Sequence, residues 1–182
     1  FLLNNLRDIE RTGDIRSYKK DLVDLYVNRD QHSFSTQVTD LDNIQNPSIH
    51  SLLSSKYHEA QMHRLNIHAE IPDPVIHNYL TDLDLAVVLG HLMDNAIDGA
   101  RKASEGFISL AYFDEEDCQS FIIESTIAEE QVPLSMMSTQ LSHPEGGIGV
   151  NAVQDILERY PNTSFSVRSQ NRKMMQILEM RP

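Results

Sequence analysis

The hydrophobic residues of the chain recur in two patterns, and the switches between them divide the sequence into elements. Steps of three and four, typical of helices that bury one face, occur in the ranges 2–9, 15–25, 49–60, 84–102 and 150–160. Runs typical of half-buried strands occur in the ranges 65–71, 106–113, 119–125, 164–169 and 174–180. The sequence therefore predicts a chain that mixes helices and strands.

The first two helical segments are separated by Thr12-Gly13-Asp14, where glycine suits a helix end and aspartate an N-cap. About 30 residues bury too little apolar surface to fold alone, so this helical hairpin should pack on the rest of the chain or on a second copy of itself, and we expect the second copy. Residues 28–45 are mostly polar and are interpreted as a frayed helical extension or a linker. We divide the chain into a hairpin, 1–45, and a second domain, 46–182. Because the first residue is Phe1, we expect a fragment of a longer protein.

Composition narrows the classes of partner. The 182 residues include 27 acidic and 15 basic side chains, a formal charge of −12. This charge repels a phosphate backbone, so nucleic acid is not expected as a partner. Cys118 is the single cysteine, which excludes a disulfide framework and a cysteine-based zinc site and fits a reducing, cytoplasmic compartment. The sequence has no run of about 18 apolar residues, the length that a membrane span requires.

The segment 84–102 is predicted to be an amphipathic helix that begins at a capping box, Thr81-x-x-Asp84. At 100° per residue, one half of its surface is apolar and the other half is polar. The polar stripe consists of Asp84, His91, Asp94, Asn95, Asp98, Arg101 and Lys102. Its oxygen atoms suit Mg²⁺, a hard cation that takes one or two protein oxygens and completes its shell with water and phosphate. An ordinary solvated helix face has the same pattern.

A second motif lies between a long loop and a helix. Residues 126–146 show neither period, and a loop of this length is usually a lid or a binding element. It ends in Gly146-Gly147-Ile148-Gly149, directly before the helical segment 150–160. Such a turn offers backbone N–H groups and a helix N-terminus to a phosphate. A flexible hinge is the alternative interpretation.

Taken together, the two motifs resemble a known family. Residues 89–98, Leu-Gly-His-Leu-Met-Asp-Asn-Ala-Ile-Asp, resemble the asparagine-box helix of sensor histidine kinases. Residues 146–160 resemble the second glycine box of these kinases and the helix that follows it. The chain is most similar to peptide-pheromone sensor kinases of the accessory-gene-regulator and competence type. Their superfamily, GHKL, also contains gyrase, heat-shock chaperone and mismatch-repair ATPases.

The resemblance implies a fold and a site. The fold is α+β, a two-layer α/β sandwich with helices on one face of a mixed sheet, and ATP lies between the helices and a mobile lid. Asn95 matches the asparagine that binds Mg²⁺, and His91, one helical turn earlier, is its companion among the candidate catalytic residues. The further candidate contacts to nucleotide are Asp98, Arg101 or Lys102, Ser125, and the amides of Gly147 and Gly149.

Two positions depart from the family pattern. Ser125 stands where these kinases carry an Asn or Asp that binds the adenine amino group. A serine hydroxyl can accept that hydrogen bond directly or through water.

The phosphoacceptor histidine of the family falls upstream of Phe1. His58, followed by Glu59, imitates the acceptor pattern, but a lone helical histidine is seldom a nucleophile without an orienting partner, so we assign it a surface role.

The sequence thus predicts the cytoplasmic ATP-binding region of a membrane-anchored, two-component sensor histidine kinase of the quorum-sensing type. It would transfer the γ-phosphoryl group of Mg-ATP to an upstream histidine, act as a homodimer through the hairpin, and pass the phosphoryl group to a response regulator. One alternative is a degenerate module of the same fold that serves dimerisation or regulator docking without ATP turnover. A serine kinase of the anti-sigma type is a third reading, disfavoured by the hairpin.

Overall fold

The computed structural model describes residues 40–115, 117–130 and 150–182. The described elements are η1 (Asp40–Asn43), α3 (Pro47–Met62), β1 (Asn66–Glu70), α4 (Asp82–Lys102), β2 (Phe107–Glu115), β3 (Cys118–Thr126), α6 (Val150–Leu157), β4 (Thr163–Gln170) and β5 (Lys173–Met180). The predicted N-terminal hairpin, most of the predicted lid and the Gly146–Gly149 turn lie outside the described residues. Every helix and strand predicted between residues 47 and 115 is present.

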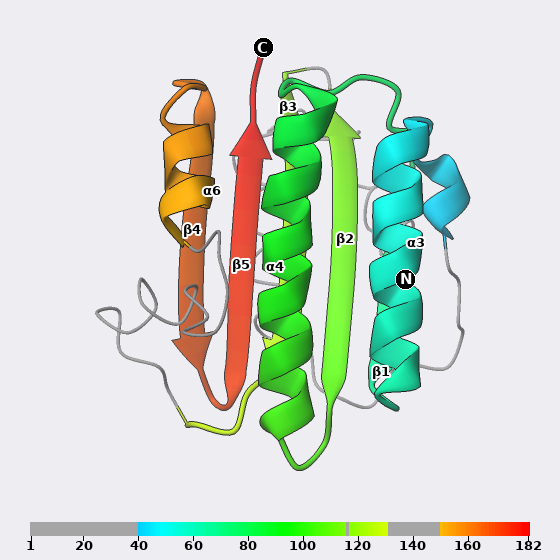
Figure 1. Ribbon diagram of the computed structural model, residues 1–182, viewed down its shortest axis with the longest axis vertical. Helices are drawn as coiled ribbons and strands as arrows, with labels where there is room; N and C mark the ends of the chain where they lie inside the picture. Colours follow the sequence, from blue (N-terminus) through cyan, green and yellow to red (C-terminus); the bar gives the residue numbers. More distant parts are fainter. Residues whose placement is uncertain (1–39, 116, 131–149) are drawn as a thin grey trace, which may run out of the picture. The chain divides into compact units, whose positions relative to one another are not determined.

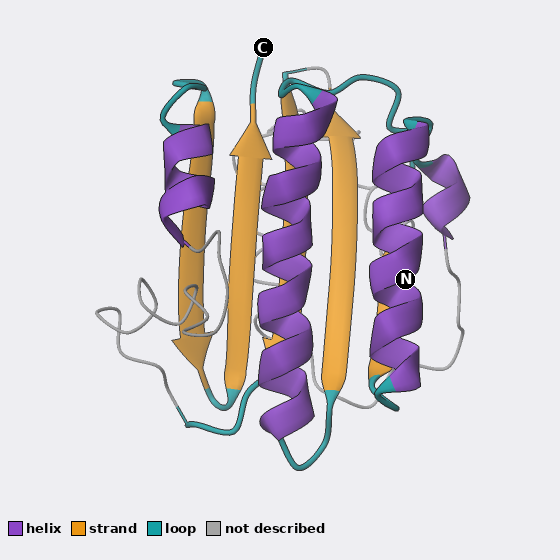
Figure 2. Ribbon diagram, viewed as in Figure 1, coloured by secondary structure: helices purple, strands orange, loops and turns teal. Residues whose placement is uncertain are grey.

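The five described strands form one mixed sheet in the order β1-β2-β3-β5-β4. β1 and β2 are parallel, with Ile67 opposite Ile108, and the other neighbours are antiparallel. The helices α3, α4 and α6 lie side by side on one face of this sheet, with α4 in the middle (Figure 1). The same two layers are plain when helices and strands are coloured separately (Figure 2). The α+β fold and its mixed sheet are therefore confirmed.

Alternation along the strands decides which residues meet the helices. Gln176 of β5 donates a hydrogen bond to the backbone carbonyl of Leu92 in α4, so Gln176 lies on the helix-covered face. Its partner in the β3 ladder is Ile123, and Ser125 lies two residues further along β3 on the same face. The core between the layers contains Leu85, Leu89, Leu92, Met93, Ala96, Leu110, Tyr112, Phe121, Ile123 and Leu178.

Side-chain caps fix the start of the two long helices, and the sequence predicts the one at the start of α4. The Asn46 carboxamide accepts hydrogen bonds from the backbone N–H groups of Ser48 and Ile49, and Pro47 occupies the first turn of α3. The Thr81 hydroxyl accepts the N–H of Asp84 at the start of α4. These contacts satisfy amides that have no partner within the helix.

Three predicted boundaries differ from the structure. β2 and β3 extend to Glu115 and Cys118, which form the last pair of the ladder, so the acidic turn between them is shorter than four residues. α6 ends at Leu157 rather than at Tyr160. Tyr160 leaves the helix because Pro161 cannot continue it and because its hydroxyl is bound to α4. The end of the polar segment 28–45 also packs on the domain, since Leu41 and Ile44 are buried in its core.

Within the residues that the structure describes, no helix is long and apolar enough to cross a lipid bilayer.

The Gly106 position between α4 and β2 leads to a prediction about stability. A Cβ atom there would meet the side chain of Leu65 and would lie 3.0 Å from the backbone carbonyl oxygen of Ala100. We expect Gly106→Ala to lower the free energy of unfolding by about 1–3 kcal/mol, the usual cost of overpacking. Urea denaturation followed by circular dichroism measures this change.

Gly90→Ala is the matched control for this prediction. A Cβ atom at Gly90 would meet only Leu52 Cδ1, at 3.8 Å, which is ordinary van der Waals contact. Alanine is favoured over glycine in a helix interior by about 1 kcal/mol, so Gly90→Ala should be neutral or stabilising. Equal stability of the two variants would contradict the packing argument.

Candidate functional site

The helix α4 has two flanks, and the polar stripe predicted for it is divided between them. Asp94 lies on the flank that faces α3, where its carboxylate is 2.5 Å from the Nζ atom of Lys56. Lys56 also contacts Glu59, at 2.8 Å. Burial lowers the pKa of Lys56, but the hydrogen bonds to Asp94 and Glu59 outweigh it and hold that pKa above the ordinary value. Asp94 is therefore engaged in an ion pair between the two helices.

The other flank of α4 faces α6 and the end of β3. The spacing of one helical side places four residues on this flank: Asp84, Asn95, Gly99 and Lys102. The intervals between them are eleven, four and three residues. At one end of the flank, Asp84 contacts residues that follow α6. At the other end, Gly99 lies against Ile127, just beyond β3.

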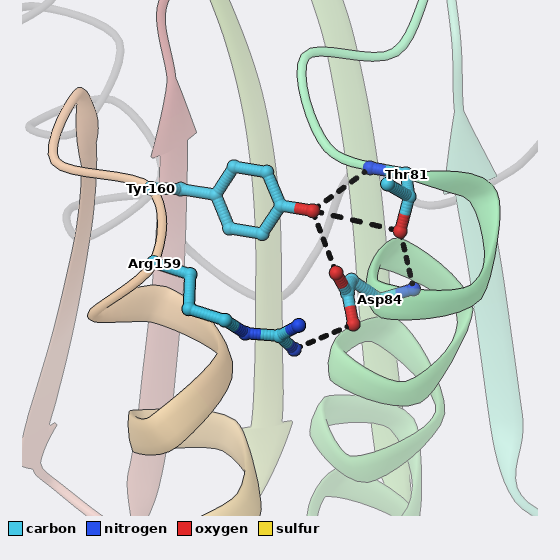
Figure 3. Close-up of polar contacts among 4 residues, drawn as sticks. All are labelled: Thr81, Asp84, Arg159 and Tyr160. Carbon is cyan, nitrogen blue, oxygen red and sulfur yellow. Dashed lines mark hydrogen bonds and ion pairs between the residues drawn. The ribbon is translucent and has the colours of Figure 1, made fainter.

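A network of four residues joins the start of α4 to the segment after α6 (Figure 3). The Tyr160 hydroxyl donates a hydrogen bond to Oδ2 of Asp84, at 2.6 Å, and accepts one from the backbone N–H of Thr81, at 3.2 Å. The Arg159 guanidinium binds Oδ1 of Asp84, at 2.7 Å. We call Asp84, Arg159, Tyr160 and Thr81 the α4–α6 latch.

The latch changes the role predicted for Asp84. Its side chain is 12% exposed, so it does not belong to a solvated helix face. The hydrogen bond from Tyr160 is the main reason that the pKa of Asp84 lies below its ordinary value; burial opposes this effect, and the hydrogen bonds with the Thr81 side chain and with Arg159 reinforce it. The carboxylate therefore connects two helices and is not available as a ligand.

Buried polar atoms without a partner mark a second place on this flank. Among the described residues, four buried side-chain atoms lack a hydrogen bond: Asn95 Nδ2, Ser125 Oγ, Gln176 Oε1 and Ser109 Oγ. The first three belong to α4 and to the strand faces beneath it, whereas Ser109 points to the opposite face of the sheet. A buried polar atom without a partner costs free energy, so this cluster is suited to a polar ligand.

The positions of Ser125 and Gln176 are fixed by contacts with α4. A Cβ atom at Gly99 would lie 4.0 Å from Ser125 Oγ, so this hydroxyl lies beside the helix one turn after Asn95. Gln176 lies beneath Leu92, one turn earlier along the helix, with its Nε2 3.1 Å from the Leu92 carbonyl oxygen. Both side chains are fully buried. Asn95, Ser125 and Gln176 thus lie within about two turns of α4.

The other predicted site residues are placed as follows. His91 and Asp98 are half-buried on α4, and Asp98 is 3.8 Å from Arg101, one turn away. Lys102 is exposed at the last turn of the helix. His58, to which the sequence assigns a surface role, is exposed on α3. Gly147 and Gly149 lie outside the described residues.

The chain's own side chains do not form a ready-made metal site in the described part. No group of three or more His, Cys, Asp or Glu side chains there is arranged to hold a metal ion. A single carboxamide ligand such as Asn95 is sufficient for Mg²⁺ when phosphate and water complete its octahedron.

Sequence reasoning missed Gln176, Arg159 and the role of Tyr160. Gln176 interrupts the apolar strand 174–180, and a polar residue at an inward strand position is the signal that would have identified it. Tyr160 ends the predicted helical segment 150–160, but nothing in the sequence specifies Asp84 as its partner. Arg159 shows no sequence signal.

Comparison with known proteins identifies the family to which the chain belongs. The sequence model described as "GHKL domain" matches residues 80–181, which include α4 and every later described element. The chain therefore belongs to the GHKL domain family. No curated protein matches it significantly.

The solved structures that share this fold include catalytic regions of histidine kinases. The nucleotide-free catalytic domain of histidine kinase ThkA is 14% identical; the match covers 75% of this chain and 91% of that chain, with a TM-score of 0.58. Acinetobacter baumannii histidine kinase AdeS is 17% identical over 74% of this chain and 62% of that chain, with a TM-score of 0.55. ThkA in complex with the response regulator TrrA matches at 14% identity over 75% of this chain but 40% of that longer chain, with a TM-score of 0.58.

Proposed function

We propose that residues 46–182 bind Mg-ATP and form the catalytic region of a two-component sensor histidine kinase. One observation carries the proposal: in a GHKL fold, Asn95 Nδ2 and Ser125 Oγ are buried without partners along the α6-facing flank of α4. A nucleotide with its metal ion supplies partners for such atoms, since it combines hydrogen-bond donors and acceptors with phosphate oxygens.

The residues present fit this ligand. Asn95 would hold Mg²⁺ through Oδ1, which leaves the unpartnered Nδ2 to donate to a phosphate oxygen. When bound, the cation offsets phosphate charge. Asp94, the neighbouring carboxylate, is held by Lys56 on the other flank, so Asn95 is the candidate metal ligand.

The remaining candidate residues have roles that the proposal assigns by position. Lys102, exposed at the end of the α6-facing flank, would neutralise phosphate charge, and Asp98, half-buried on α4, would contact the nucleotide. His91, one turn before Asn95, would orient the reacting groups. The amides of Gly147 and Gly149 would contact the triphosphate.

The reaction proposed is transfer of the γ-phosphoryl group to an imidazole nitrogen, with ADP as the leaving group. The acceptor histidine would precede residue 1, and the phosphoryl group would then pass to an aspartate of a response regulator. The response-regulator complex of ThkA, which shares the fold, supports this choice of partner. The assignment to the peptide-pheromone type, the membrane anchor, the homodimer and the division at residue 45 rest on the sequence motifs and stay predictions.

A degenerate module of the same fold, used for dimerisation or regulator docking, is the second candidate. Ser125 favours it, because a hydroxyl replaces the carboxylate or carboxamide expected for adenine recognition.

Isothermal titration calorimetry of the whole chain with ATP and Mg²⁺ distinguishes the two functions. The kinase proposal predicts binding with a micromolar dissociation constant that weakens when Mg²⁺ is replaced by EDTA. A folded sample, verified by circular dichroism, that releases no heat with ATP supports the docking module.

A further inference from the structure

Gln176 and Asn95 carry complementary unpartnered atoms. Asn95 Nδ2 can only donate a hydrogen bond, and it is buried without an acceptor. Gln176 Nε2 donates to the Leu92 carbonyl oxygen, at 3.1 Å, so the other atom of this carboxamide, Oε1, is a buried acceptor without a donor. Each of the two atoms costs free energy when it is left alone, and together they can satisfy each other.

The contact with Leu92 places the Gln176 carboxamide beside Asn95. A helical carbonyl points towards the C-terminus of its helix, to the N–H group four residues on. A side chain that binds the Leu92 carbonyl oxygen therefore lies at the level of residues 95 and 96 of α4. Because Ala96 offers only a methyl group, Asn95 is the polar side chain of α4 at this level.

The sheet register gives the same placement independently. Ser125 lies beside Gly99, and Gln176 is opposite Ile123, two residues back along β3. Two strand residues span about 7 Å, the rise of four to five helical residues. Because α4 runs alongside β3 and in the same direction (Figure 1), this distance leads from Gly99 back to Asn95. β5 also lies on the α6 side of β3, the side of the flank that carries Asn95.

Resting on the proposed function, we propose that Gln176 is a positioning residue for the metal ligand Asn95. Its Oε1 accepts a hydrogen bond from Asn95 Nδ2, directly or through one water molecule, and thereby turns Asn95 Oδ1 towards the Mg²⁺ of Mg-ATP. A carboxamide nitrogen carries two hydrogens, so this bond leaves one of them for a phosphate oxygen.

The bond determines which end of the Asn95 carboxamide meets the cation. A carboxamide that turns over presents its nitrogen, which cannot bind a metal ion, in place of its oxygen. With Gln176 Oε1 on the inner side, the reversed orientation would bring two oxygen acceptors face to face. Gln176 therefore favours the one orientation in which Asn95 is a ligand.

The first test is calorimetric titration of the whole chain with ATP, once in Mg²⁺ and once in EDTA. The ratio of the two dissociation constants measures the gain in affinity from Mg²⁺. Gln176→Met keeps the length of the side chain and removes both polar atoms. It should reduce the Mg²⁺ gain about tenfold, the usual loss when a residue that orients a metal ligand is removed, and change affinity in EDTA by less than about threefold. A purely structural defect would weaken both titrations alike.

The second test needs neither nucleotide nor metal. In the nuclear magnetic resonance spectrum of the unmodified chain, one side-chain amide proton of Asn95 should be shifted downfield and exchange slowly with solvent, as a buried hydrogen bond requires. Gln176→Met should abolish both features.

Ser109→Ala is the matched control for both tests. Ser109 Oγ is also buried and without a partner, but it lies on the sheet face away from α4. This variant should keep the Asn95 signals and the full Mg²⁺ gain, and a loss of either would overturn the assignment.

The outcomes separate the inference from the proposed function. If the Mg²⁺ gain survives in Gln176→Met, or if neither Asn95 proton of the unmodified chain is hydrogen-bonded, the inference is wrong and the nucleotide-binding function stands. If a folded chain binds no ATP with or without Mg²⁺, the proposed function is wrong and the inference falls with it. The spectrum of the unmodified chain needs no variant, so it decides even where a substitution prevents folding.

Discussion

Replacing Asn95 by alanine should weaken Mg-ATP binding on the order of 100-fold. The substitution removes the one carboxamide on the α6-facing flank of α4 whose nitrogen is buried and unpartnered. It removes the proposed metal ligand together with a donor to phosphate, and even the loss of a residue that only orients a metal ligand costs 10–100-fold in affinity. Calorimetric titration of the variant with ATP and Mg²⁺ measures the loss.

Asp94→Ala is the control for this experiment. Asp94 is the adjacent residue and carries a charge, but it faces α3 and pairs with Lys56. We expect its removal to change nucleotide affinity by less than about threefold. If Asp94→Ala weakened binding as much as Asn95→Ala, the ligand would lie on the wrong flank of α4 for the proposal.

The α4–α6 latch should account for a measurable part of stability, and Asp84→Asn should lower the free energy of unfolding at pH 7 by about 1–3 kcal/mol. Hydrogen bonds to a charged group contribute about this much, and Asp84 accepts one from Tyr160 and one from Arg159. Arg159 is more than half exposed, so its ion pair contributes less than the Tyr160 hydrogen bond. Tyr160→Phe tests that hydrogen bond alone.

The latch also predicts the direction of the pH dependence. The folded state lowers the pKa of Asp84, chiefly through Tyr160. The folded state therefore binds the proton less readily than the unfolded chain does, and the stabilisation is complete above the ordinary pKa of about 4. This stabilisation is lost as the pH falls from the ordinary pKa towards the lowered pKa of Asp84 in the folded state. Urea denaturation between pH 7 and pH 3 should show a smaller loss of stability for Asp84→Asn than for the unmodified chain.

Asp73→Asn controls for the general effect of removing a carboxylate, since Asp73 is exposed in the turn after β1. Its acid-dependent loss of stability should follow that of the unmodified chain. If Asp84→Asn lost as much stability between pH 7 and pH 3 as the unmodified chain does, the role of the latch would be contradicted.

Much of the fold could be predicted from the sequence because its signals are local. Several of these signals specify structure through neighbours in the chain, and each matches the structure. They are the caps at Asn46-Pro47 and Thr81, the alternation in 65–71 and the apolar face of 84–102. The mixed sheet was expected only from the resemblance to a family, and the strand order β1-β2-β3-β5-β4 was not predicted. Periodicity does not specify which strands pair.

The candidate site was only partly predictable, for a physical reason. Helical periodicity places Asp84, Asp94 and Asn95 on one polar half of α4, but it does not show which neighbouring element each side chain meets. Asp94 pairs with Lys56 of α3, and Asp84 pairs with residues beyond α6 that are 75 and 76 positions away in the sequence. Long-range contacts of this kind divide the predicted stripe, whereas the Nδ2 atom of Asn95 is buried without a partner.

The most direct test of the central claim is to follow the side-chain amide resonance of Asn95 by nuclear magnetic resonance while ATP is added with and without Mg²⁺. A ligand on the α6-facing flank of α4 should shift the Asn95 side-chain signal and the Gly99 backbone signal, with a further Mg²⁺-dependent change at Asn95, and should leave Gly90 and Asp94 nearly unchanged. Unshifted Asn95 and Gly99 signals at saturating Mg-ATP, or shifts confined to the flank that faces α3, would contradict it.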